Sequence, residues 1–140
     1  MFAWLTPRFA TLDAYPLTKE IPMVQTDFRT ALQGTNEIEI TVTGRTSGRS
    51  FSYPVWFVLE GDKLSLLPAR GSETDWYKNV RKRPSIRLAA KGKTFKTFAT
   101  PITDEAKVSE VVKKFRDKYG ARTVNTLSSR LDVAVEVPLT

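Results

Sequence analysis

The sequence of 140 residues predicts a single α+β domain in which six short, mostly antiparallel strands close into a small barrel with helices beside it. Three observations support this fold. Segments with an apolar residue at every second position recur along the chain, as in half-buried strands. Short glycine turns join several of them, and such turns leave no room for the crossovers of a parallel sheet. One later segment has the period of an amphipathic helix.

The chain is expected to begin with an arm and a short helix over residues 1–34, followed by the barrel at residues 35–140. Prolines make the opening irregular, and a weak helix over residues 23–32 ends at Gly34, because glycine readily takes the left-handed conformation that follows a helix. A chain of this length can bury one core, so we expect one domain overall.

Six strands and two further helices are expected after the arm. Thr74 can cap a short helix that Pro84 stops, and Thr103-Asp104 opens a longer helix that Gly120 closes. A closed sheet removes exposed edges and buries one face of every strand, which favours a barrel over a flat sheet. The expected strands cover residues 37–42, 51–59, 63–67, 85–90, 93–100 and 131–137.

The composition excludes several kinds of chemistry. The chain has no cysteine and no histidine, so disulfides, thiolate nucleophiles, Cys/His zinc sites, imidazole bases and His-ligated haem are all absent. We therefore expect no metal site and no catalytic side chain, and the chemistry of an enzyme would belong to an organic cofactor. The longest apolar run, Val55 to Leu59, has five residues, so we expect no transmembrane segment and a cytoplasmic protein.

The net charge of +7 is concentrated in the middle of the chain. Between Arg45 and Lys96 lie 12 basic residues and only four acidic ones. This asymmetry indicates an anionic partner for the middle third, although a solvated basic surface is the plain alternative.

Three segments in this basic region suit an anionic ligand. They are the glycine-bracketed turn Gly44–Arg49, the loop Ala69–Ser72 and the aromatic and basic helix Asp75–Arg83. Backbone N–H groups in glycine turns bind anions, and arginines add forked donors for phosphate. Aromatic residues on nearby strands suggest a flat, phosphorylated ligand such as a flavin.

Each segment also has an ordinary structural interpretation. The turn can be a hairpin that simply needs glycines, and Trp76 is expected to pack into the barrel. Basic residues among aromatics also suit single-stranded nucleic acid. However, one strand face carries Phe51, Tyr53, Val55 and Phe57, as in a core or closed pocket, so we expect no nucleic-acid partner.

The order of these motifs resembles the deazaflavin (F-420)-dependent nitroreductase family. Ile40–Gly48 followed by Pro54–Phe57 is similar to the family's glycine turn and strand, Leu67–Ser72 to its next loop, and Asp75–Pro84 to its Trp-Tyr helix. The resemblance covers residues 37–100. It implies an FMN-binding split β-barrel fold of the pyridoxamine-phosphate oxidase kind with flanking helices, and it is compatible with a homodimer.

The resemblance also implies a ligand and its site. Coenzyme F-420 would pass a hydride to a small electron-poor acceptor, namely a quinone, an enone or a nitro compound. Nitro-reducing members draw tyrosines from the region after the long helix, where Tyr119 is the nearest candidate. Carried over by motif, Arg45, Ser47, Gly48 and Arg49 would contact the tail or phosphate, Pro54, Val55, Trp56 and Phe57 would border the ring, Arg70, Gly71 and Ser72 would lie near the phosphate and ring edge, and Trp76 and Asn79 would complete the pocket.

Two other functions fit the same fold class. One is an FMN-binding enzyme of the pyridoxamine-phosphate oxidase kind, and the other is a non-catalytic carrier of an apolar or tetrapyrrole ligand. Both remain open on the sequence, because one fold hosts many ligands.

Overall fold

Two four-stranded antiparallel sheets make up the β structure of this computed structural model, which describes residues 28–139. Sheet 1 has the strand order β2-β1-β5-β6, and sheet 2 has the order β3-β4-β8-β7. Sheet 1 consists of β1 (Glu37–Thr43), β2 (Ser50–Trp56), β5 (Ser85–Ala90) and β6 (Lys93–Phe98). Sheet 2 consists of β3 (Val58–Glu60), β4 (Lys63–Leu66), β7 (Thr100–Ile102) and β8 (Ala134–Pro138).

The arm and the start of the first helix lie outside the described residues. Within them, residues 28–32 are helical, in agreement with the end of the helix expected at residues 23–32.

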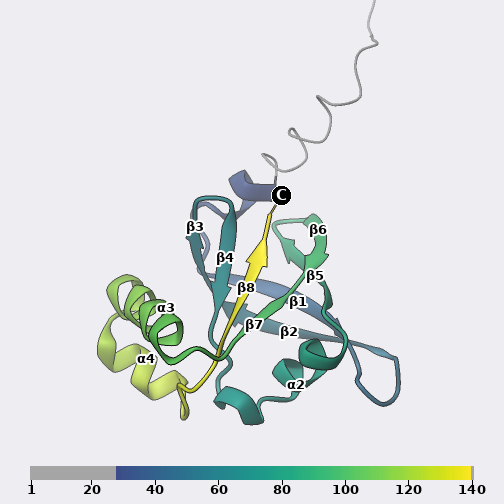
Figure 1. The fold of residues 1–140 in the computed structure, drawn as a ribbon. Helices are drawn as coiled ribbons and strands as arrows, with labels where there is room; N and C mark the ends of the chain where they lie inside the picture. The colour runs from purple at the N-terminus through teal and green to yellow at the C-terminus, as the bar shows by residue number, and fades with distance from the viewer. Residues whose placement is uncertain (1–27, 140) are drawn as a thin grey trace, which may run out of the picture.

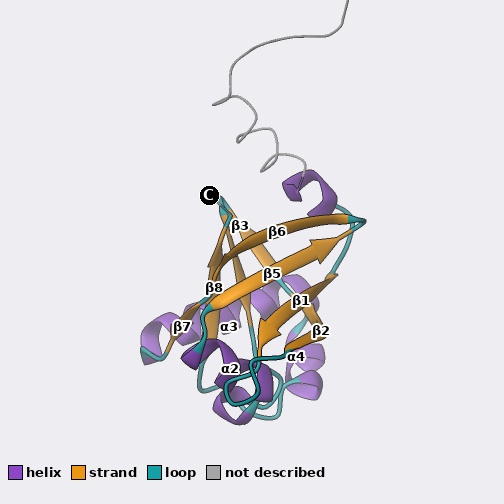
Figure 2. Ribbon diagram, turned by 90° about the vertical axis from the view of Figure 1, so that its right-hand side faces the viewer, coloured by secondary structure: helices purple, strands orange, loops and turns teal. Residues whose placement is uncertain are grey.

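Six strands were expected, and that number is wrong, because two of the expected strands each divide between the sheets. The segment expected at residues 51–59 forms β2 and β3 on either side of Phe57, and the segment expected at 93–100 forms β6 and β7 on either side of Ala99. Both dividing residues are buried. The bends let one chain segment serve both sheets, so the sheets join at two corners around a common interior (Figures 1 and 2).

The interior between the sheets is filled by the alternate residues that the sequence pattern marks as apolar. Ile40, Leu64 and Leu88 are fully buried there and come from three different strands. Burial of apolar surface is the main favourable term in folding, so this interior carries the stability of the barrel. Its other buried strand residues are Ile38, Val42, Leu66, Ile86, Ala90, Val135 and Val137.

Helices α3 (Glu105–Tyr119) and α4 (Ala121–Leu127) cover the outer side of sheet 2 (Figure 1). The expected cap is present, since the Asp104 carboxylate accepts a hydrogen bond from the Lys107 N–H at 3.1 Å. Helix α4 was not predicted. Gly120 ends α3 as expected, and it is also the N-cap residue of α4. Between helices and sheet lies a second apolar cluster that includes Val111, Phe115 and Val124.

Helix α2 (Asp75–Lys82) closes one end of the barrel (Figure 2). Trp76, Tyr77 and Val80 on this helix are buried in the interior cluster, which confirms the expected burial of Trp76. A one-turn 3-10 helix, η2 (Gly71–Glu73), precedes it. Thr74 is the N-cap residue, but its hydroxyl accepts from the Arg70 N–H at 2.8 Å instead of capping α2.

The end of α3 holds the bend at Phe57. The Tyr119 hydroxyl donates to the Phe57 carbonyl at 2.6 Å, and the Lys118 ammonium donates to the same oxygen at 2.9 Å. The Lys118 nitrogen also lies 4.3 Å from the centre of the Phe57 ring. A carbonyl at a bend between two sheets needs such hydrogen-bond partners, because burying an unpaired carbonyl costs free energy.

We predict that Tyr119→Phe lowers the free energy of unfolding by about 1 kcal/mol, the usual contribution of one hydrogen bond. Chemical denaturation measures the change. Tyr53→Phe is the matched control, since no hydrogen bond of the Tyr53 hydroxyl is present within residues 28–139. Equal stabilities of the two variants would show that the Tyr119 hydroxyl does not hold the bend.

Candidate functional site

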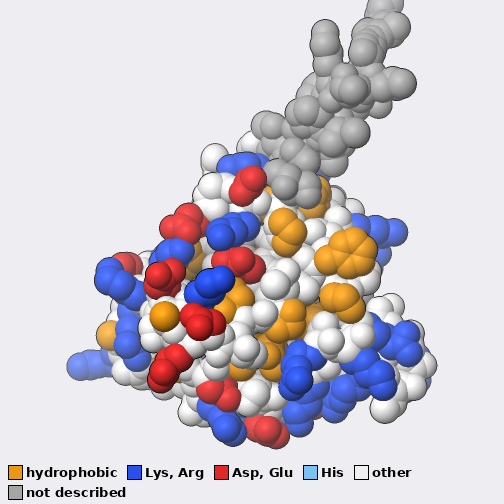
Figure 3. Space-filling view, viewed as in Figure 1, with side chains coloured by type: hydrophobic (Ala, Val, Ile, Leu, Met, Phe, Trp, Pro, Cys, Tyr) orange, Lys and Arg blue, Asp and Glu red, His pale blue; other side chains and the backbone are white. Residues whose placement is uncertain are grey.

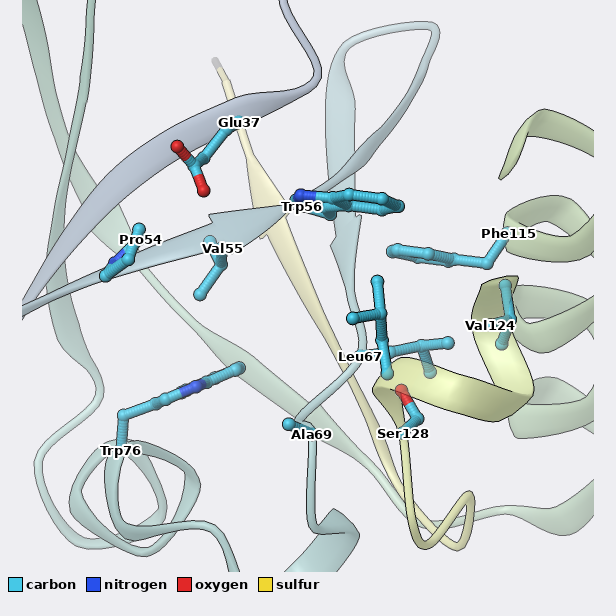
Figure 4. Close-up of a pocket in the computed structure, with 11 residues that line it drawn as sticks. Glu37, Pro54, Val55, Trp56, Leu67, Ala69, Trp76, Phe115, Val124 and Ser128 are labelled. Atoms are coloured by element: carbon cyan, nitrogen blue, oxygen red, sulfur yellow. The ribbon is translucent and has the colours of Figure 1, made fainter. Parts of the chain in front are cut away.

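An apolar cavity of about 240 Å³ opens where β2 meets the helices and the loop after β4 (Figure 4). β2 contributes one wall, α2 the opposite wall, and α3 and α4 the inner end. The lining residues are Glu37, Pro54, Val55, Trp56, Leu67, Ala69, Trp76, Phe115, Val124, Leu127 and Ser128.

The cavity has the form of a slot between aromatic and aliphatic walls. Figure 4 shows the Trp76 side chain extending into the cavity opposite Pro54 and Val55. Trp56 is held in place by Tyr119, whose ring lies 4.5 Å from it between centroids. A wall of large apolar side chains with few polar groups is typical of sites for flat organic ligands.

A second groove is larger but chemically different. It has a volume of about 530 Å³ and runs between α3 and β7. Its lining is rich in charged side chains that pair with one another, as Lys63 does with Glu136 at 3.0 Å. Charges that already satisfy each other leave little for a ligand, so the apolar cavity is the better candidate site.

The turn Gly44–Arg49 is a closed hairpin loop beside α2. The Gly44 N–H donates to the Arg49 carbonyl at 2.7 Å, and Gly48 has a φ of +74°, which explains the need for glycine there. The Ser47 hydroxyl accepts from the Arg49 N–H at 3.2 Å. Thr46 to Arg49 are exposed, so the side chains of Thr46 and Arg49 face solvent.

Arg45 and Asn79 join this turn to α2. The Asn79 side-chain oxygen accepts from the Arg45 guanidinium at 2.8 Å and from the Arg45 N–H at 3.1 Å. Asp75 adds an ion pair with Arg45 at 3.9 Å. Arg45 and Asn79 were both expected to contact a ligand, but in the structure they bind each other and hold the turn against α2.

Basic side chains gather around α2 and the turn. Figure 3 shows a cluster of Lys and Arg at the lower right of the face in view, over these two elements. The last turn of α2 carries Arg81 and Lys82, and the exposed Arg49 lies in the turn. An exposed basic surface of this kind attracts anions.

In the loop Arg70–Ser72, the donors of Ser72 bind Asp132. The Ser72 N–H donates to the Asp132 carboxylate at 3.0 Å and the Ser72 hydroxyl at 2.6 Å, while the Arg130 guanidinium pairs with it at 3.1 Å. Gly71 has a φ of +56°, and a Cβ at this position would overlap the same carboxylate. A side chain of the protein therefore occupies an anion cradle that sequence reasoning assigned to a ligand.

The thirteen expected ligand residues fall into three groups in the structure. Four of them, Pro54, Val55, Trp56 and Trp76, line the cavity. Phe57 is 1% exposed and packs in the barrel interior instead. The others lie in the turn, in the loop beside Asp132 and on α2, outside the cavity lining: Arg45, Ser47, Gly48, Arg49, Arg70, Gly71, Ser72 and Asn79.

Several lining residues were missed by the sequence analysis. Val124, Leu127 and Ser128 belong to α4 or its end, which was not predicted. Phe115 was recognised as a helix core residue but not as part of a site. Tyr119, the expected substrate-facing tyrosine, does not line the cavity, because its hydroxyl binds the Phe57 carbonyl.

The pKa of the Asp132 carboxyl lies below its usual value of 3.8. Partial burial raises this pKa, but the two hydrogen bonds from Ser72 and the charge of Arg130 lower it by more. Since the pKa is lower in the folded state, the interaction stabilises the protein above the unfolded pKa and is lost as the pH falls through the folded pKa.

We predict that Asp132→Asn lowers the free energy of unfolding at neutral pH by about 1 kcal/mol, because it removes a charge-assisted hydrogen bond at a partly exposed site. The difference between wild type and variant should shrink as the pH falls below 3.8. Denaturation curves between neutral and acidic pH measure this. Asp62→Asn is the control, and a pH-independent difference for Asp132→Asn would contradict the prediction.

In the part of the chain from residue 28 to 139, no helix has the length and hydrophobicity needed to cross a membrane.

Comparison with known proteins identifies relatives of this chain. A family model described as "F420H(2)-dependent quinone reductase" matches residues 20–138. No curated protein matches the sequence.

Solved structures share the fold at low sequence identity. One, of an F420-H2 dependent reductase, is 22% identical with a TM-score of 0.58 and aligns 73% of this chain with 93% of its own. Another, described as a domain-swapped dimer, is also 22% identical with a TM-score of 0.58, over 86% of this chain and 99% of its own. HutZ, the haem storage protein of Vibrio cholerae, is 14% identical with a TM-score of 0.61, over 82% of this chain and 89% of its own. At these identities the likeness shows a common split-barrel fold.

Proposed function

Because this chain belongs to the F420H(2)-dependent quinone reductase family, we propose that it is an oxidoreductase that uses coenzyme F-420 and a small electron-poor acceptor. The acceptor classes are a quinone, an enone and a nitro compound. The observation that carries the proposal is the apolar slot between β2 and Trp76, next to an exposed basic turn.

The residues present fit a flat ring with an anionic tail. The slot is lined by Pro54, Val55 and Trp76, which offer apolar faces to a ring system. Its volume of about 240 Å³ is below the roughly 300–1,000 Å³ of sites that enclose whole ligands, so the tail would lie outside it. The exposed side chains of Arg49 and Arg70 would hold the tail or phosphate outside the slot.

The cofactor, when bound, supplies the hydride, and the protein supplies position and environment. The chain has neither histidine nor cysteine, so no imidazole or thiolate takes part. Trp76 and Val55 would fix the plane of the ring. The buried Phe115 and Val124 would keep water from the inner end of the slot, which strengthens every electrostatic interaction there.

Two alternatives keep the same site. FMN would place its ring in the slot and its phosphate at the turn. Because it lacks the longer anionic tail of F-420, it would not need the rest of the basic surface. A carrier of an apolar or tetrapyrrole ligand would use the slot alone, and haem held there would need a ligand other than histidine. A nucleic-acid function is less favoured because Trp76 is 5% exposed and offers no stacking platform.

The domain-swapped dimer among the solved relatives supports a homodimer for this chain as well. Size-exclusion chromatography with light scattering measures the assembly directly.

We predict that the protein binds F-420 more tightly than FMN, because the basic surface over α2 and the turn suits the longer anionic tail. Fluorescence titration of the purified protein with each cofactor gives the two dissociation constants. Equal or tighter binding of FMN would favour the FMN alternative.

We also predict that Arg49→Ala weakens the binding of F-420 by about 1–3 kcal/mol, the range for a hydrogen bond to a charged group. The free energy of unfolding should change by less than about 0.5 kcal/mol, as for ordinary surface substitutions. The same titration and a denaturation curve measure both.

Lys93→Ala is the matched control for Arg49→Ala. Lys93 is exposed and follows the β5–β6 turn, at the end of sheet 1 opposite to Gly44–Arg49. Its removal tests the effect of net charge alone. If both variants lose the same affinity, Arg49 makes no specific contact.

A further inference from the structure

Glu37 brings a negative charge to the apolar cavity. Among the described residues that line the cavity, it is the one with an ionisable side chain, and the sequence analysis did not select it. Figure 4 shows its carboxylate beside β2, between Pro54 and Trp56 and across the strand from Trp76. Glu37 is exposed to solvent and also borders the aromatic slot, so a ligand at this end of the cavity would meet its negative charge.

The charge lies at the far end of the β1–β2 hairpin from the basic turn. Glu37 pairs with Trp56 in the sheet, whereas Thr43 pairs with Ser50 beside the turn Gly44–Arg49. β2 has seven residues, which corresponds to about 23 Å at ~3.3 Å per residue. The site is therefore polarised, with cations at one end for an anionic tail and a carboxylate at the other.

No ion pair of Glu37 is present within residues 28–139. Lys118 is committed to the Phe57 carbonyl and to the rings of Phe57 and Tyr119. The rings nearest to the cavity belong to Trp56, Trp76 and Phe115, and the faces of aromatic rings attract cations. A carboxylate together with aromatic walls is the usual environment for an organic cation.

We propose that the end of the cavity at Glu37 selects flat, electron-poor heteroaromatic cations as acceptors, such as N-alkylated pyridinium rings, and that Glu37 determines this selectivity. The proposal rests on the proposed function for the source of the hydride and narrows its acceptor class. The hydride, with its two electrons, adds to a ring carbon conjugated with the C=N⁺ bond. The π electrons move to nitrogen and cancel its charge, so the acceptor needs no proton.

The donor loses the two electrons that the acceptor gains. Reduced F-420 is oxidised by the loss of the hydride and releases its ring N–H proton to solvent. A neutral quinone, in contrast, takes up a proton for every hydride. Glu37 is the one acid among the described residues that line this cavity, so a cationic acceptor suits these residues better than a neutral one.

Binding of two matched probes tests the proposal without any cofactor. The probes are 1-methylnicotinamide, which is a cation, and nicotinamide, which is neutral and differs by one methyl group. Isothermal titration calorimetry with wild type, Glu37→Gln and Glu39→Gln gives the ratio of the two dissociation constants for each protein. Glu39 is the control, since it lies two residues along the same face of β1, is exposed and does not line the cavity.

We expect wild type and Glu39→Gln to prefer the cation, and Glu37→Gln to lose about fivefold of that preference, the effect of one partly solvated ion pair. The preference of wild type should also fall at high salt. The same ratio in all three proteins, a wild-type preference for the neutral probe, or no binding of either probe would each overturn the proposal.

Failure of the proposed function looks different. If the protein prefers the cation through Glu37 but does not bind F-420, the selectivity of Glu37 stands and the deazaflavin assignment is wrong. If the protein binds F-420 but shows no preference for the cation, the proposed function stands and the proposed role of Glu37 is wrong.

Discussion

At Phe57 the chain leaves sheet 1 and enters sheet 2, and this one residue connects the barrel to the helix layer. Its ring packs inside the barrel, while its carbonyl accepts hydrogen bonds from Tyr119 and Lys118 at the end of α3. The position of α3 is thereby coupled to the strand that carries the wall of the cavity. Trp56, the residue before the bend, packs on Tyr119 and extends the same coupling to the cavity itself.

The site combines parts with different degrees of support. Val55 and Trp76 stand on regular elements that the core holds, since Trp76 is buried in the interior cluster and Val55 packs against it. The turn Gly44–Arg49 has no such support from the core, and Asn79 provides it by binding both the backbone and the side chain of Arg45. The apolar slot is therefore built into the fold, and the basic turn is attached to it by a few polar contacts.

The fold could be predicted where the signal is local. Alternation of Ile38, Ile40 and Val42 gives β1 directly, because strand period and burial coincide. The division at Phe57 could not be predicted, because an uninterrupted apolar segment looks the same whether or not it bends. Helix α4 was missed because Ala121–Leu127 carries threonine and asparagine, which are weak helix formers, directly after a glycine.

The site was predictable in part for the same reason. The glycine turn, the strand with Pro54–Trp56 and the Trp76 helix are local motifs, and the structure brings the last two together around one cavity. The contact between Ser72 and Asp132 joins residues 60 positions apart, and no local sequence pattern predicts it. Glu37 looked like the polar partner in an alternating strand, and the packing of α2, α3 and α4 against β2 makes its surroundings a cavity.

One further consequence concerns the rim of sheet 1. Within the described residues, β2 pairs with β1 alone, so its other side is an open row of backbone groups that another chain could extend by strand addition. Pro54 stands in the middle of that strand and offers no N–H to an incoming partner. The residue that shapes the wall of the cavity thus also protects the protein from edge-to-edge aggregation, which restricts the side chains that can replace it.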